Sequence, residues 1–163
     1  MTTTNETKIV AKPGHQDLFI EREFDAPRNL VFRAFSEPDL LVQWLGPDNL
    51  SMEIDKFDNR SGGSYRFVHV DERGNRYGFN GAIHEVAAPE RVIRTFEFEG
   101  LPERGHVSME IALFEALPND RTRLKIQSIF KSVEDRDGMV ASGIEGGMNE
   151  SYAKLDVLLK KLK

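Results

Sequence analysis

Five polar side chains could do chemistry in this chain, because each one occurs within an otherwise apolar pattern. Tyr65, His69, Arg94 and Ser128 share the alternation of apolar residues in segments with strand character, and Tyr152 lies on the apolar stripe of a C-terminal helical segment. An inward-facing cation such as Arg94 needs an ion-pair partner, or a ligand that carries an anionic or carbonyl group. The alternative is an arginine at a strand edge that reaches solvent. These residue types therefore indicate polar recognition within an apolar site.

The spacing of the histidines gives little support to a metal site. His15, His69, His84 and His106 lie far apart and form neither an H-x-H nor an H-E-x-x-H pattern. The chain has no cysteine, which excludes disulfides, thiol nucleophiles and cysteine-bound metals. It also lacks the G-x-S-x-G pattern of a serine nucleophile. We predict no metal and no other cofactor, and we favour binding over catalysis, with His69 or Tyr65 as the groups that an enzyme would use.

Most of the predicted lining of the site is apolar. Successive side chains of a strand point to opposite faces, so the apolar parity of each segment predicts an inward face. A solid core would show the same pattern, and both interpretations stay open. Glu97, Glu99 and Glu110 have the outward parity, which indicates a solvated sheet face. The predicted lining consists of Trp44, Tyr65, Phe67, His69, Phe79, Ile83, Arg94, Phe96, Met109, Ile111, Ile126, Ser128, Ile144, Met148 and Tyr152.

These residues have to be positioned by a strand-rich chain with helices near both ends. Leu18 to Phe24 alternate as a strand, with Arg22 on the apolar parity, and a helix follows from Pro27. A second short helix carries Trp44, which either packs against the sheet or touches a ligand, and this helix ends at Gly46. Turn residues then divide an antiparallel meander. The predicted strands are 51–57, 64–70, 76–86, 91–99, 106–116 and 122–130.

A long amphipathic helix is predicted over residues 143–162. Its apolar residues recur at three- and four-residue spacing, which is typical of a helix with one buried face. Gly143, Gly146 and Gly147 disfavour a helix, each by about 1 kcal/mol relative to alanine, and they predict a kink or break. This glycine segment could act as a hinge for ligand entry, or it could only permit close packing of the helix on the sheet.

Composition limits the partners of the protein. The chain of 163 residues suits one domain, predicted over residues 16–163 after a flexible tail at residues 1–15. A formal net charge of -5 without a basic block makes nucleic acid an unsuitable partner. No stretch approaches the roughly 20 apolar residues of a membrane span, and the polar N-terminus lacks the apolar segment of a signal peptide. We therefore expect a cytoplasmic protein.

The order of elements and several short strings resemble a known family. Over residues 17–162 the chain resembles the START/Bet v 1-like (SRPBCC) superfamily, and within it the bacterial branch named after the activator of the heat shock protein 90 ATPase. The resemblance implies an α+β helix-grip fold, in which a curved antiparallel sheet wraps around a long C-terminal helix, with two short helices after the first strand. The strings are Asp25-Ala-Pro27, Trp44-Leu-Gly-Pro47, Arg60-Ser-Gly-Gly63, Pro89-Glu-Arg-Val92 and Gly143-Ile-Glu-Gly-Gly-Met148.

The resemblance implies a class of function rather than one reaction, because a single fold hosts many functions. The superfamily includes lipid carriers, plant hormone binders, polyketide cyclases and co-chaperone domains. We expect a small, mostly hydrophobic ligand that is lipid-, flavonoid- or polyketide-like and binds in a cavity between the sheet and the C-terminal helix. The alternatives are a chaperone-associated protein-interaction domain and a polyketide cyclase- or hydrolase-like enzyme. An exposed apolar patch on the outer sheet face would favour the interaction domain.

Overall fold

The fold is an antiparallel meander flanked by helices, as the turn pattern of the sequence predicts. A computed structural model describes residues 5–163. The helices are α1 (Arg28–Ser36), α2 (Pro38–Leu41), α3 (Val133–Ala141) and α4 (Ile144–Leu162). The strands are β1 (Lys8–Val10), β2 (Asp17–Phe24), β3 (Ser51–Phe57), β4 (Ser64–Val70), β5 (Arg76–Ala87), β6 (Arg91–Phe98), β7 (Val107–Leu117) and β8 (Arg121–Ile129). The predicted meander strands agree with β3 to β8 to within one residue at each end.

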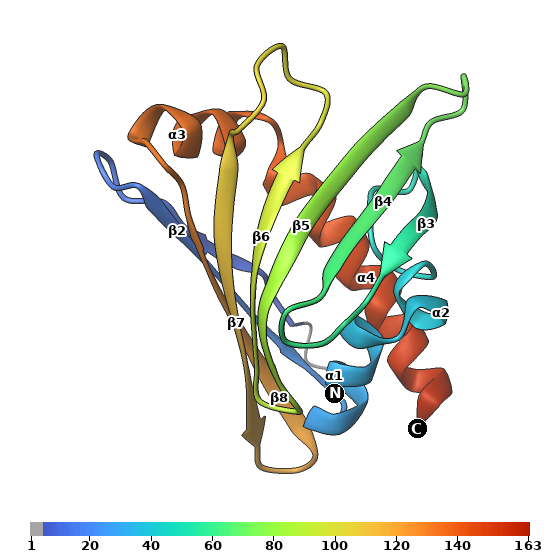
Figure 1. Cartoon of the computed structure of the whole chain (residues 1–163). Coiled ribbons are helices and arrows are strands. Elements are labelled where there is room, and N and C mark those ends of the chain that lie inside the picture. The colour runs from blue at the N-terminus through green and yellow to red at the C-terminus, as the bar shows by residue number, and fades with distance from the viewer. Residues whose placement is uncertain (1–4) are drawn as a thin grey trace.

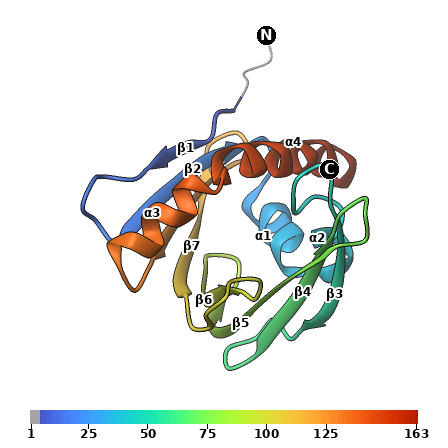
Figure 2. The ribbon, with the colours of Figure 1, turned by 90° about the horizontal axis from the view of Figure 1, so that it is seen from above.

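The strands of residues 5–163 form one curved sheet, in the order β1-β2-β8-β7-β6-β5-β4-β3. Every neighbouring pair is antiparallel. The sheet curls around α1 and α2, and α4 lies along the open side of the curl (Figure 1). Seen from above, α4 lies opposite β5 and β6, with α1 and α2 between them (Figure 2). This arrangement confirms the predicted helix-grip fold.

Two register irregularities help the sheet to curl, and one glycine makes room for a side chain inside the curl. The register shifts between Ile54 and Lys56 on β3, and again between Ile83 and Glu85 on β5. Such bulges bend a strand and increase its twist. At Gly81 a Cβ atom would collide with the Thr95 carbonyl oxygen and with the Tyr65 ring. Glycine at this position therefore lets Tyr65 lie close to the neighbouring strands.

Polar contacts fasten α4 on two sides. On one side, Arg22 of β2 donates two hydrogen bonds to Asp156 of α4, at 2.8 and 2.6 Å. On the other, Lys154 Nζ donates to the Gly46 carbonyl oxygen at 2.7 Å, and the Gly46 N–H donates to Ser151 Oγ at 2.9 Å. The inward cation that the alternation of β2 predicts is thus a buried arginine with an ion-pair partner. These contacts hold α4 across the mouth of the curled sheet.

The glycine-rich segment breaks the helical region only at its first glycine. Gly143 has a φ of 86° and separates α3 from α4, a left-handed conformation that glycine adopts readily. Gly146 and Gly147 lie inside α4. The predicted break is therefore confined to the start of the segment, and the hinge function stays a prediction. Within residues 5–163, no helix is both long and apolar enough to span a membrane.

The core divides into two clusters of buried apolar residues. The first cluster joins β2 and β8 to α1 and α4, and includes Phe24, Val31 and Leu155. The second cluster lies on β4 and β5 and consists of Tyr65, Phe67 and Ile83. At the edge of the sheet, residues 8–10 pair with β2, so this part of the predicted tail over residues 1–15 belongs to the sheet. Residues 1–4 lie outside the described part of the chain.

Leu155 is fully buried, whereas Val157, two residues further along α4, is 56% exposed. We expect Leu155→Ala to lower the free energy of unfolding by about 2–5 kcal/mol, because it removes buried methyl groups and leaves a cavity. Val157→Ala is the matched control and should change it by less than about 0.5 kcal/mol. Urea denaturation of the two variants measures both values. Equal midpoints for Leu155→Ala and the parent would contradict this placement of α4.

Candidate ligand-binding site

Stacked aromatic side chains cover part of the concave face of the sheet. The ring of Phe79 on β5 lies 5.1 Å from the ring of Phe67, 5.4 Å from Phe96 and 5.1 Å from Phe98. The first two pairs are stacked and the third is tilted. We call these four residues the aromatic shelf. Flat rings of this kind offer a planar apolar molecule a large contact area.

The aromatic shelf is not sealed by the helices. Phe67 is buried, but Phe79, Phe96 and Phe98 are each half-buried although they lie on the concave face. Side chains at the centre of the first cluster, such as Leu155, are fully buried. In Figure 2, α4 lies across the curl from β5 and β6 instead of resting on them. The shelf is therefore the part of the concave face that solvent or a small molecule can reach.

An ion pair lies beside the shelf on β6 and β7. Arg94 Nε donates to Glu110 Oε1 at 3.3 Å, and the two side chains are 26% and 23% exposed. The Arg94 guanidinium also lies over the Tyr65 ring, 4.6 Å from its centre. Among the described residues, neither terminal nitrogen of Arg94 has a hydrogen-bond partner. The pair therefore offers free N–H donors and a carboxylate acceptor next to the aromatic rings.

The two tyrosines near this pair are neutral structural groups. The Tyr65 hydroxyl donates to the Thr95 carbonyl oxygen at 2.5 Å. Burial raises the pKa of the Tyr65 phenol well above its ordinary value, Arg94 opposes this effect, and Glu110 adds to it. Burial likewise raises the pKa of Tyr152, with a further contribution from Glu110. Neither phenol is therefore ionised near neutral pH.

The register of β7 corrects one part of the predicted lining. Met109 pairs with Thr95, and Ile111 pairs with Ile93, which places both side chains on the outer face of the sheet. The predicted inward orientation of Met109 and Ile111 is wrong. The inward residues of β7 include Phe114, which is buried against the rings of Phe32 and Phe35 of α1 at 5.1 and 5.3 Å. Because side chains alternate along a strand, fixing Phe114 inward turns Met109 outward.

The same correction reveals Glu110, which the sequence pattern places on the outer face. Glu110 pairs with Arg94 on β6 and with Ser128 on β8, both of which face inward. One signal in the sequence points to it, namely the inward cation Arg94, which needs an acid on a neighbouring strand. Glu110 is thus the site residue that reasoning from apolar alternation misses.

Most other predicted lining residues lie on the concave side, but not all of them border the shelf. Ile83 and Ser128 are buried, and Ile126 belongs to the first cluster. Ile144 and Met148 of α4 are half-buried and pack against that cluster. Contact of any of these residues with a ligand stays a prediction.

Trp44 and His69 are packing residues in this structure. The Trp44 ring is buried, and its Nε1 donates to the Ala34 carbonyl oxygen at 2.9 Å. His69 is buried edge-on against the rings of Phe67 and Phe79, at 5.2 and 5.4 Å. Within the described residues, His69 Nδ1 has no hydrogen-bond partner. This histidine therefore supports the shelf from one end rather than facing an open site.

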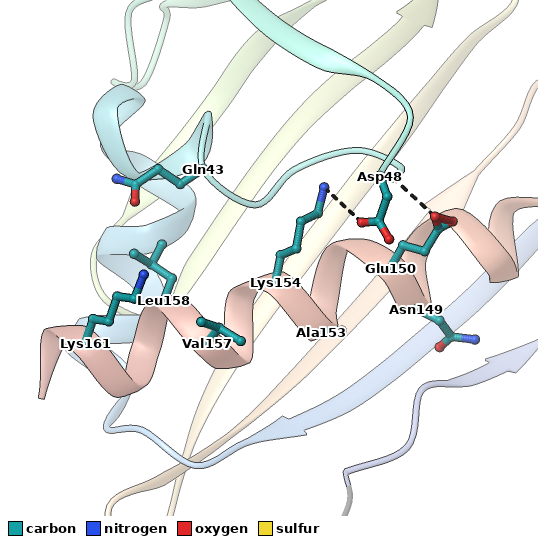
Figure 3. A pocket seen from close by; sticks show the side chains of 9 residues that line it. All are labelled: Gln43, Asp48, Asn149, Glu150, Ala153, Lys154, Val157, Leu158 and Lys161. Atoms are coloured by element: carbon teal, nitrogen blue, oxygen red, sulfur yellow. Dashed lines mark hydrogen bonds and ion pairs between the residues drawn. The ribbon is translucent and has the colours of Figure 1, made fainter. Parts of the chain in front are cut away.

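A separate hollow of about 570 Å³ lies on the other side of α4 (Figure 3). Three of its charged residues are already engaged: Lys154 Nζ lies 3.6 Å from Asp48 Oδ1, and the Asp48 N–H donates to Glu150 at 3.2 Å. None of the predicted lining residues borders it. The hollow is lined by Gln43, Asp48, Asn149, Glu150, Ala153, Lys154, Val157, Leu158 and Lys161. We therefore place the candidate site at the aromatic shelf.

The burial of His69 has a consequence for the pH dependence of stability. Burial lowers the pKa of His69 below its ordinary value, a backbone hydrogen bond to Ser51 opposes the shift, and the Lys154 charge adds to it. The unfolded state therefore binds this proton more readily than the folded state. We expect the free energy of unfolding to fall as the pH drops from about 6.5 toward the lowered folded pKa.

Urea titrations at several pH values between 7.5 and 5 measure this effect in the parent, in His69→Phe and in His84→Gln. His69→Phe should lose part of the decline in stability on the acid side. His84 is exposed on β5, so its substitution should keep the full decline. A decline in His69→Phe as steep as that in the parent would show that His69 does not cause it.

The fold and the sequence both match known proteins. The model of the family described as "Activator of Hsp90 ATPase homolog 1-like protein" matches residues 25–160. A solved protein of Rhodobacter sphaeroides is 25% identical with a TM-score of 0.84, and the match covers 94% of this chain and 98% of that one. The AHSA1 protein of Silicibacter pomeroyi is 26% identical with a TM-score of 0.74, covering 90% and 99%.

A protein of Nitrosomonas europaea is 28% identical with a TM-score of 0.79, and the match covers 91% of this chain and 96% of that one. No curated protein shows significant similarity to the sequence. The family model spans the strands of the shelf, the Arg94–Glu110 pair and almost all of α4. The chain therefore belongs to the family of Activator of Hsp90 ATPase homolog 1-like proteins.

Proposed function

We propose that this domain binds a small, mostly hydrophobic molecule on the concave face of its sheet, between the aromatic shelf and α4. The observation that supports it most directly is the partial exposure of Phe79, Phe96 and Phe98 on a face where the neighbouring apolar side chains are buried. Ligand sites in proteins are typically apolar with a few polar groups that fix orientation. The Arg94–Glu110 pair provides such groups at the margin of the shelf.

The ligand class is elongated or planar and apolar, with one polar end, such as a lipid, a flavonoid or a polyketide-like molecule. Binding is favoured over a cyclase or hydrolase activity because the two groups that the sequence suggests as acid or base are engaged. The Tyr65 hydroxyl already donates to Thr95, and His69 is buried among aromatic rings. A cytoplasmic location stays a prediction of the sequence.

A ligand screen by NMR tests this function. We expect a planar apolar compound to bind with a dissociation constant on the order of 1 µM, equivalent to about 8 kcal/mol, and to shift resonances of β4 to β6 and α4. Phe96→Ala should weaken binding by roughly 3- to 10-fold, because one stacked ring is lost. Phe19→Ala, on the outer face, should leave affinity unchanged. Shifts confined to the outer face, or no binder in a broad library, would count against this function.

A second function is favoured by a different surface. The outer face of β7 carries Val107, Met109 and Leu113, which are 37%, 40% and 36% exposed. Contiguous exposed apolar residues often mark protein interaction sites. The family description refers to activation of the Hsp90 ATPase. The second candidate is therefore a protein-interaction domain that docks on a chaperone of the Hsp90 type through this outer strip of β7.

An ATPase assay with the Hsp90-type chaperone of the source organism separates the two functions. If the outer strip docks, the protein should raise the ATPase rate, and a double variant with Met109→Ser and Leu113→Ser should lose this effect. Phe96→Ala, which changes only the concave face, should keep it. No change in ATPase rate with the parent protein would remove the second candidate and leave the first untouched.

A further inference from the structure

The ion pair beside the aromatic shelf combines two opposite charges at one place on the concave face. Arg94 and Glu110 lie on adjacent strands as direct cross-strand partners, and their only hydrogen bond joins Nε to Oε1 at 3.3 Å. The Nε–H is directed to the acid, while the terminal nitrogens of Arg94 have no hydrogen-bond partner among the described residues. A small molecule on the shelf would therefore meet N–H donors and a carboxylate acceptor side by side.

The other charged groups near this face do not disturb this balance. Arg22, the other inward cation, is bound to Asp156 by two hydrogen bonds. Tyr65 and Tyr152 are buried phenols that carry no charge near neutral pH. The field that a ligand experiences is thus set by a neutral pair, with the negative member as exposed as the positive one.

Such a pair discriminates between ligands by charge. A carboxylate placed on the Arg94 donors would also lie close to the Glu110 carboxylate, and like charges repel strongly where water is partly excluded. A neutral group with an acceptor and a donor on neighbouring atoms meets no repulsion. Its acceptor takes a hydrogen bond from Arg94, and its donor gives one to Glu110, so both members of the pair stay satisfied.

We propose that the Arg94–Glu110 pair selects uncharged ligands whose polar end carries a hydrogen-bond acceptor beside a donor, such as a primary amide, a lactam or a hydroxyl next to a carbonyl, and rejects free carboxylates. This inference rests on the proposed ligand-binding function of the concave face. It names the chemistry of the polar end, whereas the aromatic shelf accounts only for the apolar body of the ligand.

Four naphthalene compounds of nearly equal size test the inference by NMR titration at pH 7.5. They are 2-naphthamide (acceptor and donor), methyl 2-naphthoate (acceptor only), 2-naphthoate (anion) and 2-methylnaphthalene (no polar group). We expect 2-naphthamide to bind most tightly, about tenfold more tightly than 2-naphthoate, because its bonds to the charged pair are unopposed. The ester should lie between them.

Two glutamate variants isolate the charge of Glu110. Glu110→Gln keeps the size and the acceptor oxygen but removes the charge, so 2-naphthoate should gain about tenfold in affinity while 2-naphthamide gains nothing. Comparing one compound in two proteins cancels its own cost of desolvation. Glu115→Gln is the control, because Glu115 lies on the outer face of the same strand, where it pairs with Lys125, and it should leave all affinities unchanged.

The outcomes separate this inference from the function on which it rests. If 2-methylnaphthalene binds at the shelf but 2-naphthoate binds as tightly as 2-naphthamide, the selection is overturned and the ligand-binding function stands. If none of the four compounds binds, the selection is overturned, and the broad library screen alone decides the ligand-binding function. Should Glu110→Gln fail to fold, equal binding of 2-naphthoate and 2-naphthamide by the parent protein would still overturn the selection.

Discussion

The contact between Arg22 and Asp156 determines how α4 lies on the sheet. Arg22 is nearly inaccessible to solvent, and its guanidinium lies 4.7 Å from the centre of the Phe24 ring and 5.9 Å from that of Tyr152. A buried cation without a partner is so unfavourable that the helix must present Asp156 at this position. This requirement fixes both the rotation and the axial position of α4. Together with the contacts of Lys154 to the loop after α2, it sets the width of the curled sheet.

Once α4 is held in this way, the concave face divides into a closed part and an open part. Leu155, Leu158 and Leu159 fill the space over β2 and β8 and complete the first cluster. The same residues leave Phe79, Phe96 and Phe98 only half-buried, because the sheet curves away from the helix at β5 and β6 (Figure 2). The burial of apolar surface that stabilises the fold is thus concentrated in one half of the molecule. The other half keeps the aromatic shelf and the Arg94–Glu110 pair accessible.

The sequence predicts the inward or outward orientation of side chains on those strands in which only one face is apolar. On β4 the aromatic residues Tyr65 and Phe67 share one parity, so their inward orientation follows directly. On β7 both parities carry apolar residues, and alternation alone cannot distinguish the outward Met109 from the inward Phe114. Tertiary packing decides the orientation, because Phe114 packs against the rings of Phe32 and Phe35 of α1. The orientation of Glu110, and with it the polar half of the candidate site, depends on the same choice.

The two halves of α4 differ in how firmly they are held. Its buried residues run from Ser151 to Leu159, whereas no residue from Ile144 to Glu150 is buried, and two of these are glycines. Segments with few buried contacts open at a lower free energy than the rest of a domain. We therefore expect the first two turns of α4 to unwind more readily than the rest of the helix, while the Arg22–Asp156 pair stays intact. A ligand would then enter beside the shelf through local opening, which requires much less free energy than unfolding the whole domain.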